Sequence, residues 1–131
     1  MSLRGSSLAG LAYFLVALGW GFILGALREI VVAPRLGGLA AVALEVPIML
    51  TISWIAARAL VRIFAVPSTL AARLAMGLLA FVLLQIAEFA LAAWFGTPIE
   101  VFVAALATAK GVLGLSAQVI YALIPLALRR F

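Results

Sequence analysis

Residues 19–38 read GWGFILGALREIVVAPRLGG, and this stretch places two charges inside a segment that is otherwise typical of a membrane-spanning helix. Arg28 and Glu29 stand side by side, a few residues before the segment reaches Ala33-Pro34. Proline disfavours a helical conformation at the residue before it, and Gly37-Gly38 permits a tight reversal of the chain. The stretch therefore predicts the end of one apolar helix, a turn and the start of a second helix.

The whole chain shares this apolar character. Of its 131 residues, 69% are hydrophobic and only 10% are charged, and the mean hydropathy is +1.38. A soluble domain is about half apolar and about a quarter charged. We therefore expect an integral membrane protein whose main partner is the lipid bilayer.

Several classes of chemistry are disfavoured by the composition. The chain has no cysteine and no histidine, which removes thiolate sites, the usual general base and the commonest metal ligand. The net charge is +5, but the basic residues stand at the ends of apolar runs rather than on one soluble face, so we expect no nucleic-acid partner. Glutamates could bind a hard cation, but the neighbouring basic residues argue against a metal site. No Gly-rich phosphate loop precedes a helix, and we expect no cofactor.

Four apolar runs are each long enough for the roughly 20 residues that cross a bilayer as a helix. They cover residues 8–33, 38–62, 70–95 and 99–128. The first run is too long for the core of a cleaved signal peptide, so we expect it to be retained as a span. Short breaks favour antiparallel neighbours. The predicted fold is an all-α, four-helix antiparallel transmembrane bundle that forms a single domain over residues 1–131.

The break before the fourth run resembles a capping box. Thr97 stands at the expected N-cap, Pro98 at the first helical position and Glu100 three residues after the cap. We expect a continuous helix from this point to residue 128.

The basic residues predict the orientation. If the N-terminus is inside, six of the nine basic residues flank the inner ends of the spans: Arg4, Arg58, Arg62, Arg73, Arg129 and Arg130. The positive-inside rule then places both termini in the cytoplasm, with the chain in the inner membrane as a multi-pass protein. All four glutamates fall in the outer half.

Each predicted helix carries one charge well inside its apolar run: Arg28, Glu45, Glu88 and Lys110. Lys110 would lie deepest, about 16 Å from the start of the fourth helix. Charges at this depth are costly and normally face the bundle interior, so we expect them to pair, with Glu45 and Glu88 as candidate partners of Arg28. Glu29 points about 100° away from Arg28 on a helix, so we expect it to meet the headgroup region or to cap the set of charges.

Helical spacing extends this polar face toward the cytoplasm. Gln85 lies one turn below Glu88, and Gln118 and Tyr121 follow Lys110 on the fourth helix. Small residues at similar spacings predict close helix packing. These residues are Ala17, Gly21, Gly25, Gly77 and Gly114.

Three functions fit these observations. The polar residues could form a binding or conduction site of a small transport protein, because ionisable groups in a membrane often mark function. They could instead hold the helices of an accessory or assembly subunit in register. Intramembrane acid–base chemistry by glutamate and lysine is a third alternative, but no enzyme motif accompanies it, which favours a non-enzyme. A carrier of this size would need to form a homo-oligomer or join a larger membrane complex.

Three segments, GFILGALR (21–28), EVPIM (45–49) and SWIAAR (53–58), together resemble a group of uncharacterised small four-span proteobacterial membrane proteins. The resemblance implies four spans and shared positions for Arg28 and Glu45, but no activity. The first segment is also similar to the first helix of dual-topology fluoride channels, and the length to small multidrug resistance exporters. The chain has no asparagine, and its deep glutamates lie in the second and third runs, so neither activity is implied.

Overall fold

The computed structural model describes residues 3–130, and this part of the chain is helical with no strand. The elements are α1 (Leu3–Leu27), η1 (Arg28–Val32), α2 (Ala33–Leu36), α3 (Gly38–Ile63), α4 (Leu70–Trp94), α5 (Ile99–Leu106), α6 (Ala109–Ala127) and η2 (Leu128–Arg130). Four helical segments are long and apolar enough to span a membrane. The all-α four-helix bundle predicted from the sequence is confirmed.

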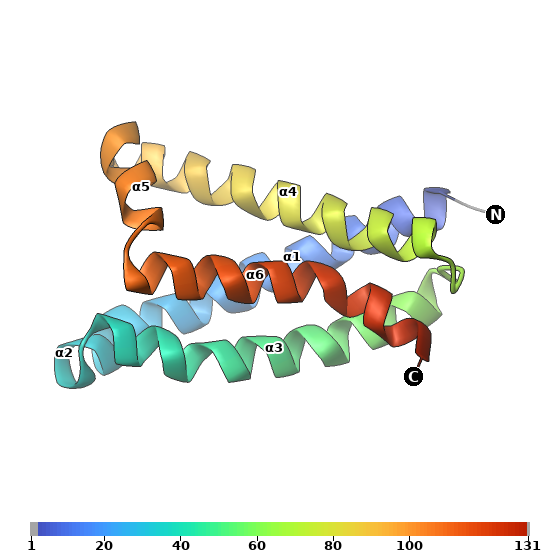
Figure 1. Ribbon diagram of the computed structural model, residues 1–131, viewed down its shortest axis with the longest axis horizontal. Coiled ribbons are helices and arrows are strands. Elements are labelled where there is room, and N and C mark those ends of the chain that lie inside the picture. The colour runs from blue at the N-terminus through green and yellow to red at the C-terminus, as the bar shows by residue number, and fades with distance from the viewer. Residues whose placement is uncertain (1–2, 131) are drawn as a thin grey trace.

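Helices that follow one another along the chain run antiparallel, but α3 and α4 lie diagonally across the bundle (Figure 1). α1 packs against both α3 and α4, and α6 packs against the same two helices from the other side. The link at residues 64–69 therefore crosses one end of the bundle. We call this end, where α1 begins and α6 finishes, the packed end, and the opposite end, which carries α2 and α5, the open end.

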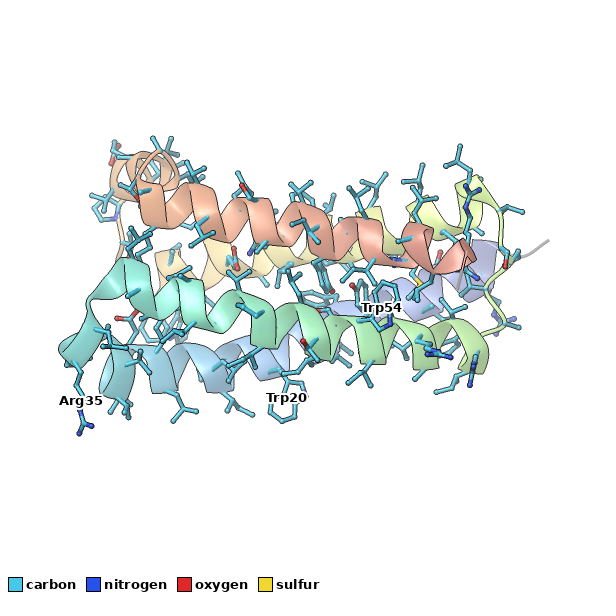
Figure 2. All side chains as sticks on the ribbon, turned by 60° about the horizontal axis from the view of Figure 1, so that its bottom comes forward. Trp20, Arg35 and Trp54 are labelled. Carbon is cyan, nitrogen blue, oxygen red and sulfur yellow. The ribbon has the colours of Figure 1, made fainter. Side chains whose placement is uncertain are left out.

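The hydrophobic core lies toward the packed end. Tyr13 of α1, Ala57 of α3 and Met76 of α4 are fully buried there, next to Ile124 of α6. Large apolar side chains instead cover the outside, as Trp20 does where it points away from α1 (Figure 2). This distribution suits a lipid environment, because lipid tails are as apolar as a protein core and close packing, not burial from water, holds the helices together.

α4 and α6 touch at Gly77. A Cβ atom at this position would lie 1.9 Å from the carbonyl oxygen of Ala122, so no side chain fits. Gly10 of α1 lies similarly against the carbonyl oxygen of Met76, at 2.9 Å from the Cβ position. Gly77 and Ala17, which is 5% exposed, thus both lie where helices pack.

Three other glycines do not pack as predicted. A Cβ atom on Gly21 or Gly114 would meet nothing within 4 Å, and one on Gly25 would meet only the Arg28 guanidinium at 3.7 Å. The prediction of a glycine packing face is wrong at these positions, because the helices have already diverged toward the open end. Their small size instead leaves space.

Two tyrosines link α1 and α6. Their rings stack with centroids 4.1 Å apart, and each hydroxyl donates a hydrogen bond to the other residue's carbonyl oxygen, at 2.7 Å from Tyr13 and 2.9 Å from Tyr121. Pro125 lies four residues after Tyr121 and has no N–H to donate, so the Tyr121 carbonyl lacks its helical partner. The Tyr13 hydroxyl replaces that donor.

The first helical run continues beyond its predicted end. η1 is a turn of π-helix in which Ala33 N–H donates to the Arg28 carbonyl. The wider turn comes directly before Pro34, whose ring would clash with the carbonyl one regular turn earlier. The helical path therefore passes Pro34, and the reversal occurs at Gly37, where φ is 89°.

The predicted continuous helix 99–128 is wrong. It is divided into α5 and α6 by a break at Ala107-Thr108 (Figure 1). Thr108 caps α6 by accepting from Gly111 N–H at 3.1 Å, and its hydroxyl donates to the Ala105 carbonyl at 2.6 Å. The capping box also fails, because Pro98 is the N-cap of α5 and no side chain bonds there.

Candidate functional site

A cleft of about 1020 Å³ lies between the α1–α3 hairpin and the α4–α6 hairpin, toward the open end. Its lining comes from α1, η1, α3, α4, α5 and α6 and is mostly apolar. Charged side chains line one region of it: Arg28, Glu29, Glu45, Glu88 and Lys110. The four charges that the sequence distributes over four predicted helices thus share one cavity.

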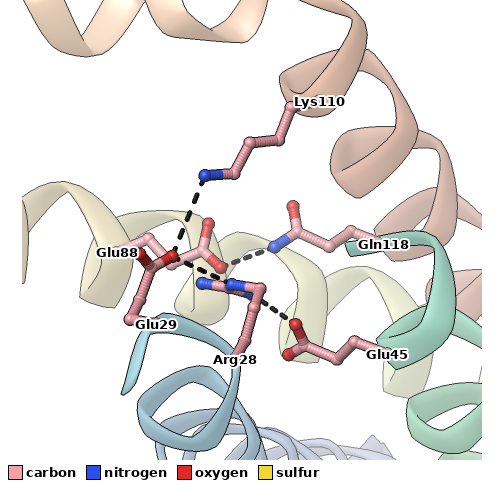
Figure 3. Close-up of polar contacts among 6 residues, drawn as sticks. All are labelled: Arg28, Glu29, Glu45, Glu88, Lys110 and Gln118. Carbon is pink, nitrogen blue, oxygen red and sulfur yellow. Dashed lines mark hydrogen bonds and ion pairs between the residues drawn. The ribbon is translucent and has the colours of Figure 1, made fainter. Parts of the chain in front are cut away.

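Arg28 is at the centre of this region (Figure 3). Its guanidinium bonds Glu45 across to α3 and Glu29 on its own turn, the latter at 3.1 Å from Nε to Oε1. The Arg28 and Glu45 side chains are only 26% and 14% exposed, so the charges support each other inside the bundle. The expected contact between Arg28 and Glu45 is therefore present.

Glu29 belongs to the same group of charges, so of its two expected positions the structure favours the cap on this group over the headgroup level. It accepts from Arg28, and its Oε1 also lies 3.8 Å from Lys110 Nζ (Figure 3). The prediction assumed a regular α-helix, whereas these two residues begin the π-turn, which changes the direction of successive side chains. The proline six residues after Arg28 was the available sequence signal.

Lys110 is not deep in a helix, because α6 begins only at Ala109. Its side chain is 46% exposed and reaches from α6 across the cleft toward the start of α3. A Cβ atom on Gly38 would lie 3.4 Å from Lys110 Nζ, so this glycine, which the sequence indicated only as part of a turn, makes room for the lysine. The Lys110–Glu29 pair joins the two hairpins at the open end.

Glu88 lies in a separate chain of hydrogen bonds. Gln85 Nε2 donates to Gln118 Oε1, and Gln118 Nε2 donates to Glu88 Oε1, both at 2.6 Å. Among residues 3–130, Glu88 has no ion pair. The direct ion pair expected with Arg28 is therefore absent, although the Arg28 charge still attracts this carboxylate, and the hydrogen-bond donor to Glu88 is the Gln118 amide.

The remaining predicted residues also border the cleft. Tyr121 lies at its floor, but its hydroxyl is already committed to Tyr13. Gly21, Gly25 and Gly114 line the wall, where the absence of side chains enlarges the cavity. Across the described residues, no three potential ligands among His, Cys, Asp and Glu are grouped to hold a metal ion.

The arrangement defines the class of protein as a four-helix membrane protein with a cleft whose wall is mostly apolar and carries one group of charged side chains. No known family model, curated protein or solved structure matches the chain.

Proposed function

We propose that this protein is a small membrane transport or binding protein whose ligand enters the cleft between the two hairpins. The observation that carries the proposal is the cleft itself, about 1020 Å³ in volume, with charges from η1, α3, α4 and α6 on its wall. Ligand sites are typically concave, mostly apolar and supplied with a few polar groups that orient the ligand. This cleft has that composition.

The lining favours an amphipathic ligand with a cationic end. Two cationic and three anionic side chains face the cleft. Arg28 is already bonded to Glu29 and Glu45, which makes it a poor receptor for an anion. Glu88 accepts a hydrogen bond and is attracted by the Arg28 charge, but it makes no ion-pair contact within residues 3–130, so an ammonium or similar cation would be its first direct ionic partner. The apolar wall would hold the rest of the ligand.

Two ions of equal shape and opposite charge test this assignment. Tetraphenylphosphonium and tetraphenylborate are titrated separately against the purified protein in detergent, and saturable binding is measured by equilibrium dialysis. We expect the cation to bind more tightly, and Glu88→Gln to weaken it by about tenfold, the loss of one charged interaction. Glu100→Gln is the matched control, because Glu100 is exposed on α5 and does not line the cleft. Equal binding by the wild type and Glu88→Gln would disprove the role of Glu88.

The proposed orientation places the packed end in the cytoplasm and the cleft open to the outer side of the inner membrane. The positive-inside rule supports it, since arginines concentrate at the packed end. The chain has no cysteine, so single cysteines can report accessibility. A membrane-impermeant maleimide on intact cells should label Leu36→Cys and not Ala65→Cys. Labelling of Ala65→Cys alone would reverse the topology.

A second candidate role is that of an accessory or assembly subunit. It is favoured by the fact that Arg28, Glu29 and Glu45 bond one another within the chain, as a structural network would. A double-mutant cycle on Arg28→Met and Glu45→Met measures their coupling in thermal unfolding. Strong coupling together with no binding of either tetraphenyl ion would favour the structural role, alone or within a homo-oligomer or larger complex.

A further inference from the structure

A second cavity, of about 230 Å³, lies at the packed end and is separate from the cleft. Four of its seven lining residues are arginines, and the others are neutral. The lining consists of Arg58, Val61, Arg62, Ser68, Arg73, Leu128 and Arg129. These residues come from the end of α3, the link to α4, the start of α4 and η2.

This cavity has no counter-charge in the described chain. No glutamate lines it, and all four glutamates of the sequence lie on η1, the first half of α3, the second half of α4 and α5. Arg58, Arg62 and Arg129 are exposed and make no hydrogen bond or ion pair within residues 3–130. Several guanidinium groups around one hollow repel each other unless an anion lies between them.

Arg73 gives the cavity a fixed wall. It is 4% exposed, and its Nε donates to the Pro67 carbonyl at 3.1 Å. Its two terminal nitrogens donate to Ser68 Oγ at 3.1 Å and to the Pro125 carbonyl at 3.0 Å. These bonds tie the α3–α4 link to α6. The exposed arginines therefore surround a cationic centre whose position is set by the fold.

We propose that this basic cavity binds a phosphate group, and that the headgroup of an anionic phospholipid supplies it. Guanidinium groups match phosphate geometry through paired hydrogen bonds. The cavity lies where α3 ends, α4 begins and α6 ends, which is the depth of the lipid headgroups for helices that span the bilayer. Basic pockets between transmembrane helices recognise anionic lipids in this way. The proposal is independent of the ligand assigned to the cleft.

The test compares arginines inside and outside the cavity. Arg58→Gln and Arg129→Gln each remove one cavity charge, and neither side chain makes a bond within the described residues, so both variants should fold. Arg35→Gln is the matched control, because Arg35 is exposed at the opposite end and points away from the bundle (Figure 2). Retention of phosphatidylglycerol is measured by native mass spectrometry, and thermal unfolding is followed with added phosphatidylglycerol, phosphatidylcholine or inorganic phosphate.

We expect phosphatidylglycerol to be retained by the wild type and Arg35→Gln, and to bind about tenfold more weakly to each cavity variant. Stabilisation by inorganic phosphate that is lost in the same two variants, without a preference for phosphatidylglycerol, would support the phosphate site and identify the free ion as its source. Equal retention of phosphatidylglycerol and phosphatidylcholine with no effect of inorganic phosphate would overturn the proposal. So would unchanged binding of phosphatidylglycerol in both cavity variants.

Discussion

The Tyr13 hydroxyl compensates for the missing N–H of Pro125. Its partner, the Tyr121 carbonyl, is buried and has no helical donor, whereas the Tyr13 carbonyl lies in the uninterrupted helix α1. The two hydrogen bonds of the tyrosine pair have the same form, but their loss has different consequences. Without the Tyr13 hydroxyl the Tyr121 carbonyl has no donor, whereas without the Tyr121 hydroxyl the Tyr13 carbonyl keeps its place in a regular helix. Leaving a buried carbonyl without any donor lowers the free energy of unfolding more than removing a hydrogen bond whose acceptor keeps another donor.

We predict that Tyr13→Phe destabilises the protein by about 1–3 kcal/mol and Tyr121→Phe by only about 0.5–1.5 kcal/mol. Both variants keep the stacked rings, so packing is matched. Thermal unfolding in detergent, followed by circular dichroism, measures the difference. Equal losses would show that the Tyr121 carbonyl finds another donor.

Glycines of the same sequence pattern have opposite roles in the two halves of the molecule. Gly77→Ala would place its Cβ 1.9 Å from the Ala122 carbonyl oxygen, and we predict a loss of about 1–3 kcal/mol from overpacking. Gly21→Ala adds its Cβ to open space, so the better helix propensity of alanine should leave stability equal or raise it by up to about 1 kcal/mol. Melting temperatures of the two variants provide the test, and a destabilised Gly21→Ala would contradict the open-space description.

At the scale of elements, the break between α5 and α6 places Lys110 beside Glu29. Two local features support the break: the Thr108 cap and the absence of a side chain at Gly111, where a Cβ would lie 2.1 Å from the Ala105 carbonyl oxygen. If residues 99–128 formed one helix, Lys110 would be three turns inside it. The break therefore converts a deep charge into one at the open end.

We predict that Thr108→Val destabilises the protein by about 1 kcal/mol, because both bonds of its hydroxyl are lost. Thr97→Val is the matched control and should change stability by less than about 0.5 kcal/mol, since the Thr97 side chain caps no helix. The comparison is made by chemical or thermal unfolding in one detergent. A greater loss of stability in Thr97→Val than in Thr108→Val would indicate that Thr97 does cap a helix, as the sequence predicted.

At the scale of the whole molecule, the two ends differ in packing. Buried residues are concentrated at the packed end, whereas η1, α2 and α5 contain none. Local opening requires little free energy where few contacts are lost. The open end should therefore fluctuate more than the packed end.

We predict faster amide hydrogen exchange in residues 99–111 than in residues 72–84 of the same molecule. Both segments are helical over most of their length, so the comparison isolates packing from secondary structure. Exchange is measured by mass spectrometry on the protein in lipid nanodiscs. Slow exchange throughout residues 99–111 would indicate that another chain or copy covers this end.

Much of the site was predictable from the sequence because the rule behind it is simple. A charge within an apolar run avoids lipid, so Arg28, Glu45 and Glu88 were expected to face inward, and the structure places them along one cleft together with Lys110, which lies at the start of α6. Their partners were less predictable. The π-turn brings Glu29 toward Lys110, and the amide of Gln118 takes the place of Arg28 beside Glu88. Each outcome depends on local side-chain directions that regular helical periodicity does not specify.

The sequence by itself determined that this chain forms four long apolar helices, because hydropathy and length leave no other way to satisfy the backbone in a membrane. Only the tertiary structure decided that GWGFILGALREIVVAPRLGG continues as helix past Pro34, that Gly21 and Gly25 face the cleft, and that α3 and α4 lie on a diagonal. The sequence determines the helices because helix formation depends on local hydrogen bonds. It does not determine where the helices diverge, because that depends on how side chains from all four long helices pack together.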